Sequence, residues 1–247
     1  DVLNRGHEQS RHLLLDKRAE MRRLMGRRRV AYEISELELI ASFRMRRRDD
    51  SSELLTEDFL YRQLAEKLGL PFILLDPLQL DYRLVTESFG GPFAERHQVI
   101  AIEETKESIT LAMAKPWDSE VIRSIERIKG KPVRPIVASK RDLLRIIAEF
   151  HGFRRSMRAA EAMYGSNFPD LGNIEQLHVL SNLGDADAEG QPVVQAVWYL
   201  LNYAFENRVS DIHIEPKRDE SWVRMRIDGV LHRVHRMPKV VHPAVVS

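Results

Sequence analysis

The sequence of 247 residues contains no cysteine. This absence excludes disulfide bonds and thiolate metal sites, and it fits a reducing cytoplasm as well as many periplasmic proteins. Long apolar runs are also missing: none approaches the roughly 20 residues that a membrane-spanning helix needs, and the N-terminus lacks the apolar core of a signal peptide. We therefore expect a soluble chain, with the cytoplasm as its default location.

A strong net charge is absent too, because 38 basic residues nearly balance 37 acidic ones. Such a molecule has no strong overall attraction to nucleic acid or anionic membranes. Charge is concentrated locally, since residues 1–48 hold 13 basic and seven acidic side chains. We expect the clusters Arg27–Arg29 and Arg46–Arg48 to lie at the C-terminal ends of two amphipathic helices, where positive charge suits the helix dipole. A lipid or nucleic-acid patch is the alternative.

Local signals predict a small α/β unit in the first two thirds of the chain. Thr56 is an N-cap and Gly69 a left-handed C-cap of one helix, and Asp118 and Gly130 play these parts for another. Strands and helices alternate after residue 98, which predicts helices packed on a sheet. The predicted helices cover residues 8–29, 35–45, 56–68, 93–97, 119–128 and 140–151, and the predicted strands cover residues 72–75, 99–103, 108–114 and 133–137.

A second unit begins after a stretch rich in Gly, Asn and Asp, from Gly165 to Gly190. A helix is expected over residues 192–207, with an apolar face made by Val193, Val194, Val197, Leu200, Leu201 and Ala204. Strands follow over residues 211–215, 222–227 and 230–234, and Asp228-Gly229 is a tight-turn signal between the last two. We thus predict an α+β chain in four parts: a basic helical extension (1–50), a first α/β docking domain of sandwich type (51–155), a linker (156–190), and the beginning of a second α/β domain with an antiparallel hairpin (191–247).

Two phrases in the second unit stand in a fixed order. One is Val-Ser-Asp-Ile-His-Ile-Glu-Pro at 209–216, and the other is Val-Arg-Met-Arg-Ile-Asp-Gly-Val-Leu at 223–231. Together they closely resemble the second N-terminal domain of the type II secretion and type IV pilus assembly traffic ATPases, which are general secretory pathway protein E-like. Residues 68–152 resemble, more diffusely, the first N-terminal domain of the same family. The chain therefore looks like the N-terminal region of such an ATPase, cut before its Walker A core.

In that family the second N-terminal domain packs over the nucleotide held by a RecA-like core, and its basic residues help to bind the phosphates. The resemblance places Arg224 and Arg226 in this nucleotide-binding role, with Arg233 and Arg236 as further candidates. Residues two apart on a strand share a face, and a guanidinium matches the geometry of a phosphate. The alternative is that these arginines pair with carboxylates such as Glu215 or Glu220.

Catalytic and metal signatures are lacking. No Gly-x-x-x-x-Gly-Lys-Ser/Thr phosphate loop occurs, so we expect no catalysis by this chain itself and no cofactor bound to it, whereas ATP and Mg²⁺ belong to the full-length ATPase that the resemblance implies. Asp211, His213 and Glu215 share one face of a strand, but their spacing of about 6–7 Å makes convergence on one metal ion poor. We predict no metal site.

The resemblance implies a regulatory and docking module of a hexameric motor for protein secretion or pilus assembly. Its expected partner is the cytoplasmic domain of an inner-membrane platform protein, which would hold it peripherally at the cytoplasmic face of that membrane. The alternative is a domain that senses cyclic di-GMP or another nucleotide, although the leucine-rich phrases of relatives that bind this ligand are replaced here by Arg and Asp at residues 45–52. No nucleic-acid partner is expected, because the arginine clusters lack interleaved aromatic residues.

Overall fold

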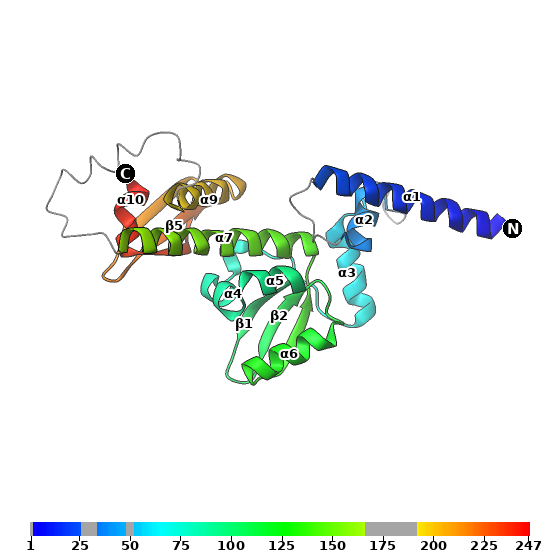
Figure 1. Ribbon diagram of the computed structural model, residues 1–247, viewed down its shortest axis with the longest axis horizontal. Helices are drawn as coiled ribbons and strands as arrows, with labels where there is room; N and C mark the ends of the chain where they lie inside the picture. Colours follow the sequence, from blue (N-terminus) through cyan, green and yellow to red (C-terminus); the bar gives the residue numbers. More distant parts are fainter. Residues whose placement is uncertain (1, 26–33, 48–51, 166–191) are drawn as a thin grey trace.

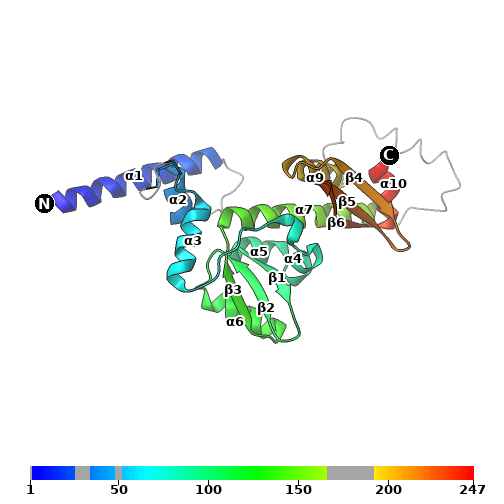
Figure 2. The ribbon, with the colours of Figure 1, turned by 180° about the vertical axis from the view of Figure 1, so that it is seen from behind.

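The computed structural model describes residues 2–25, 34–47, 52–165 and 192–247. A helical arm leads into two sheet-containing units, which are bridged by one long helix, α7 (Figures 1 and 2). The arm consists of α1 (Val2–Met25) and α2 (Glu36–Ser42), and α3 (Glu57–Leu68) joins it to the first unit. In the described part of the chain, no helix has both the length and the apolar character needed to cross a bilayer.

Local capping sets the limits of the arm's shorter helices. Ser35 forms a capping box with Glu38 at the start of α2, and the hydroxyl of Thr56 accepts a hydrogen bond from Phe59 N at 3.2 Å. Gly69 ends α3 with φ 64°, as predicted. The prediction for the second arginine cluster was wrong: α2 ends at Ser42, and Arg46 instead forms a β-bridge with Leu54. The first cluster, Arg27–Arg29, lies outside the described residues.

The first unit is built on a sheet of three strands in the order β1-β2-β3. The predicted hairpin is confirmed, because β1 and β2 are antiparallel, and β3 then pairs with β2 in parallel. The predicted strand at residues 72–75 was wrong: this segment makes only one bridge, from Phe72 to Val137, and Leu74 is 53% exposed. The elements after α3 are η2 (Pro77–Gln79), α4 (Tyr82–Ser88), α5 (Gly91–His97), β1 (Val99–Glu104), β2 (Ile109–Met113), α6 (Ser119–Lys129), β3 (Val133–Val137) and α7 (Lys140–Gly165).

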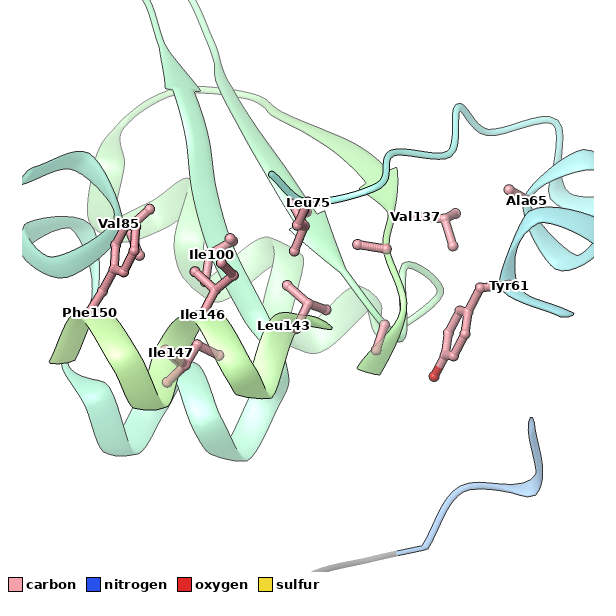
Figure 3. Close-up of a cluster of buried hydrophobic side chains, with 14 residues drawn as sticks. Tyr61, Ala65, Leu75, Val85, Ile100, Val137, Leu143, Ile146, Ile147 and Phe150 are labelled. Atoms are coloured by element: carbon pink, nitrogen blue, oxygen red, sulfur yellow. The ribbon is translucent and has the colours of Figure 1, made fainter. Parts of the chain in front are cut away.

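Helices cover both faces of this first sheet. On one face, Ile100 and Ala112 pack against Ile146 and Phe150 of α7, within the cluster shown in Figure 3. On the other face, Leu111 and its neighbours pack against α6. Every residue of β2 is buried, as expected for a central strand with apolar layers on both sides. The first unit is therefore an α/β sandwich, as the alternation of elements predicted.

Helix α7 is the main departure from the predicted elements. It was expected to end near His151, but it continues to Gly165, so the first ten residues of the predicted linker are helical. The extension is stabilised by burial: Phe150 belongs to the first core, whereas Phe153, Met157 and Ala160 belong to the second. These residues continue the three- and four-residue spacing of a helix. The rest of the predicted linker, residues 166–190, lies outside the described residues.

The second unit is a three-stranded antiparallel meander with helices on one face. Its elements are α9 (Pro192–Glu206), β4 (Asp211–Pro216), β5 (Glu220–Ile227), β6 (Val230–Pro238), η4 (Lys239–Val241) and α10 (His242–Val246), with strand order β4-β5-β6. The predicted tight turn is present, because Asp228 and Gly229 both have positive φ, 49° and 81°. The predicted face of α9 was partly wrong: Val194 and Leu201 are 42% and 56% exposed, whereas Ala196 and Tyr203 are buried.

The two units meet around a buried histidine, His235 of β6. Its ring stacks on Phe153 with centroids 4.3 Å apart, and Tyr82 meets it edge-on at 4.9 Å. Complete burial lowers the pKa of the imidazole to about 3. Nearby, α7 and α9 approach closely at Gly152, where an added Cβ would lie 2.6 Å from the Tyr199 hydroxyl. The units are therefore joined by aromatic packing around His235 and by the close approach of α7 and α9 that Gly152 permits.

Candidate functional site

The candidate site is the face of the β4–β6 sheet that points away from α7 and α9, which we call the outer face. Along β5, Ser221, Val223, Met225 and Ile227 are buried, while the alternate residues are half-exposed. This period of two places Trp222, Arg224 and Arg226 together on the outer face. In register, Asp211, His213 and Glu215 of β4 lie opposite Arg226, Arg224 and Trp222.

A register shift brings the remaining candidate arginines onto the same face. Arg233 and Arg236 are three residues apart, so a regular strand would point them to opposite sides. The pairing of β5 with β6 shifts between Val223 and Arg224, and Val234 and His235 are both buried as a result. The Arg233 and Arg236 guanidinium carbons lie 4.9 and 6.0 Å from the centre of the Trp222 ring. All four predicted arginines thus share the outer face.

Three of these arginines have carboxylate partners. The Arg224 guanidinium donates two hydrogen bonds to Glu215 Oε1, one of them from Nε at 3.0 Å. Arg226 Nε lies 3.2 Å from Asp211 Oδ2, and Arg236 Nη1 donates to Glu220 Oε1 at 3.2 Å. The alternative that these side chains pair with Glu215 or Glu220 is therefore realised for Arg224 and Arg236. Among the described residues, Arg233 contacts the Trp222 ring and no carboxylate.

Glu215 and Glu220 are each held in position by two cations. Hydrogen bonds from Arg224 and then from Lys217, whose Nζ lies 3.0 Å from Glu215 Oε2, lower the pKa of Glu215. Glu220 accepts from Trp222 Nε1 at 2.7 Å and also faces Arg83 of α4 at 3.5 Å. The outer face therefore carries a row of side-chain ion pairs around the indole ring of Trp222, and its basic side chains outnumber its acidic ones.

The arrangement suits anions better than metal ions. The carboxylates of Asp211 and Glu215 are engaged by Arg226 and Arg224, and His213 lies between them on β4. Over the described ranges, no three His, Cys, Asp or Glu side chains gather closely enough to hold a metal ion. Arginine forks presented on one rigid face are suited to bind phosphate oxygens. Sequence reasoning missed Trp222 and Lys217, although the alternation of β5 placed Trp222 beside the two arginines.

Comparison with known proteins shows similarity to proteins of type II secretion and type IV pilus machines. Residues 68–157 match the model of the MshEN domain. The chain is 30% identical over 212 residues to the type IV pilus assembly ATPase TfpB of Acinetobacter baylyi, and the match covers 85% of this chain and 36% of that protein. It is 28% identical over 188 residues to the type II secretion system protein E of Xanthomonas campestris, with 74% and 32% covered.

Two solved structures are also similar. The N-terminal domain of XpsE shares 18% sequence identity at a TM-score of 0.33, covering 57% of this chain and 93% of that one. A structure of MshE with cdg shares 21% identity at a TM-score of 0.35, covering 38% and 68%. The resemblance found in the sequence motifs is confirmed: the chain is similar to the N-terminal region of the type II secretion and type IV pilus ATPases, and residues 68–157 are similar to the MshEN domain. It spans about a third of the length of these curated relatives.

Proposed function

We propose that this chain is the docking and regulatory region of a hexameric secretion or pilus ATPase, working at the cytoplasmic face of the inner membrane. The observation that carries the proposal is the similarity to TfpB, which extends over 85% of the chain and therefore reaches into both units. The first unit, with its MshEN domain, docks the motor on the cytoplasmic domain of an inner-membrane platform protein. In the full-length protein, the RecA-like core binds ATP and Mg²⁺ and performs hydrolysis.

The outer face supplies the nucleotide-facing surface in this proposal. Arg233 is exposed and carries no carboxylate partner within the described residues, so its guanidinium is available to a phosphate without the loss of an ion pair. Arg224, Arg226 and Arg236 can exchange a carboxylate for a phosphate, because each of these anions offers two oxygen acceptors to the guanidinium fork. A positive group brought from a neighbouring domain stabilises the charge that develops during phosphoryl transfer.

Calorimetric titration of the 247-residue chain with the cytoplasmic domain of the cognate platform protein tests docking. We expect saturable binding. The matched control is the double substitution Trp222→Ser/Arg233→Gln, which alters the outer face and leaves the first unit intact, so its titration should match that of the unaltered chain. Absence of binding at high micromolar concentration would contradict the docking role.

A second candidate, binding of cyclic di-GMP, rests on the match of residues 68–157 to the MshEN domain. A thermal-shift series separates the two candidates, because a ligand that binds the native state raises the unfolding midpoint in proportion to the logarithm of its concentration. If the first unit serves only for docking, the unfolding midpoint should not change with cyclic di-GMP or cyclic di-AMP. A rising midpoint with cyclic di-GMP alone would favour the sensing function.

A further inference from the structure

Helix α9 has a second apolar face that the described part of the chain leaves exposed. Its inward-facing side chains, which belong to the second core, include Val193, Ala196, Leu200 and Tyr203. The exposed apolar side chains are Val194, Trp198, Leu201 and Phe205, at 42%, 61%, 56% and 88% exposure. At 100° per residue, these four lie within about 60° of one another around the helix axis. They therefore form one row along the helix, which we call the α9 stripe.

The α9 stripe is uncharged as well as apolar. From Pro192 to Phe205 the sequence contains no Asp, Glu, Lys, Arg or His. A helix that is apolar on nearly all sides is normally buried, and a contiguous apolar patch on a protein surface marks an interaction site. A nucleic acid or an anionic lipid surface would find no cation to pair with along this stretch. The stripe therefore suits an apolar protein surface.

The order of side chains in the α9 stripe suits a second copy of itself. Their spacing of four, three and four residues reads the same in both directions. If two copies of α9 pack antiparallel about a two-fold axis, Val194 of one copy lies opposite Phe205 of the other, and Trp198 lies opposite Leu201. Each layer then joins an aliphatic side chain to an aromatic one, which favours close packing. A parallel pair would instead place Trp198 against Trp198 and Phe205 against Phe205.

The α9 stripe exposes enough surface for a weak dimer. At about 200 Å² per aromatic side chain, Trp198 and Phe205 expose roughly 300 Å² in each copy. Two paired stripes would bury roughly 600 Å² of aromatic surface, to which Val194 and Leu201 add. Specific interfaces begin near about 1,000 Å², so this area fits reversible association. The Trp198 ring already rests edge-on against Tyr199, with centroids 5.6 Å apart, and is thus held in place as an anchor.

We propose that two copies of this chain associate reversibly through antiparallel pairing of their α9 stripes. Helix α9 lies beside α7 in the second unit (Figures 1 and 2), and its stripe is turned away from the second core. The outer face lies on the other side of the β4–β6 sheet, so pairing leaves its arginines exposed. The association needs neither a platform protein nor a nucleotide, and it stands or falls independently of the docking role.

Sedimentation velocity of the 247-residue chain alone tests the association. The weight-average mass should rise from that of one chain towards that of two between low and high micromolar concentration. Trp198→Ser/Phe205→Ser should weaken association roughly tenfold or more, because aromatic anchors dominate the binding energy of such interfaces. The matched control is Trp117→Ser/Ile128→Ser, which removes two exposed apolar side chains from the first unit and should associate as the unaltered chain does. Circular dichroism should show unchanged helix content in both variants.

Cysteine cross-linking tests the direction of pairing, because the chain contains no cysteine of its own. With a short bismaleimide, Val194→Cys/Phe205→Cys should link two chains, since its thiols lie opposite each other across the two-fold axis. Val194→Cys alone should not, because two copies of residue 194 are then about 16 Å apart along the helix axis. One chain at every concentration, an equal loss in the control pair, or cross-linking of Val194→Cys alone would overturn the proposal.

Discussion

The two sheets of this molecule have similar size but different coverage. The β1–β3 sheet is packed on both faces, and its central strand is buried at every residue. The β4–β6 sheet has an apolar core on one face only, against α7, α9 and η4, while its outer face carries Trp222 and a ladder of ion pairs. A sheet face that carries charged side chains contacts water or a partner rather than the protein's own core.

The difference indicates where each unit derives its stability. Buried apolar contacts stabilise both units, whereas half-exposed ion pairs contribute roughly 0–1 kcal/mol each. Substitutions on the inner side of the β4–β6 sheet should therefore affect folding, and substitutions on its outer side should affect function.

The largest effect should follow from Phe153→Ala. Phe153 is fully buried at the junction of the units and stacks on His235, so its removal leaves a cavity in the second core. We expect the free energy of unfolding to fall by about 3–5 kcal/mol in chemical denaturation. Phe153→Leu, which refills most of the volume, should restore more than half of the loss. A fall below 1 kcal/mol for Phe153→Ala would contradict a shared junction core.

Acid should weaken the same junction through His235. Its pKa is about 3 in the folded protein and near 6.5 when unfolded, so the unfolded chain binds more protons between these values and stability falls as the pH drops from 6.5. The expected slope is about 1.4 kcal/mol per pH unit. His235→Phe should remove this contribution, as shown by the difference between the two proteins' unfolding free energies at pH 6.5 and 4.5.

Glu149 acts in the opposite direction and provides the control for that measurement. Burial, partly offset by Arg145, raises the pKa of Glu149 to about 7, so the folded protein binds the extra proton and stability increases as the pH falls from 7 towards 4.5. Glu149→Gln should therefore steepen the acid sensitivity of the protein. An identical pH profile for His235→Phe and the unaltered chain would exclude a neutral, buried imidazole.

A smaller effect is expected where α7 meets α9. Gly152→Val would push a side chain against the Tyr199 hydroxyl, and we expect a loss of about 1–3 kcal/mol from overpacking. Gly90→Ala is the matched control, because no atom lies within 4 Å of the position of its Cβ. Equal unfolding midpoints for the two variants would show that the helices are not in close contact at Gly152.

The smallest change in stability should come from the outer face. Arg224→Gln breaks the contact with Glu215, yet both groups are about a third exposed or slightly less and exposed ion pairs stabilise little, so the unfolding midpoint should shift less than in any variant above. The measurement is the same denaturation series. A loss comparable with that of Phe153→Ala would mean that the outer face is a structural element, and the contrast between the two faces would disappear.

Local chemistry made much of the fold predictable. Thr56 and Gly69 bound α3, Asp118 and Gly130 bound α6, and the Asp228-Gly229 turn sets the β5–β6 hairpin, because each signal acts within a few residues of chain. The strand at residues 72–75 was overpredicted since apolar residues favour burial, but only a paired partner makes a strand. The length of α7 was missed because a second core, distant in sequence, stabilises its extension.

In the candidate site, too, local sequence predicted some features, whereas others depend on contacts between distant segments. Strand alternation was sufficient to group Arg224 with Arg226, whereas Arg233 and Arg236, which lie beyond the motif, were only further candidates for the same role. The register shift that turns Arg233 and Arg236 to the same face, and the burial of His235 beneath them, depend on pairing between strands and on packing against α7. No pattern within one segment encodes such contacts.

The most direct test of the account is the steady-state ATPase activity of the full-length protein carrying Arg233→Gln, compared with Arg134→Gln. Both arginines are exposed strand residues, one on the outer face and the other on β3 of the fully covered sheet. We expect kcat/KM to fall roughly tenfold or more for Arg233→Gln, because a donor that stabilises charge in the transition state is lost. Arg134→Gln should leave the activity unchanged. Equal activity of the two variants would contradict a nucleotide-facing role for the outer face.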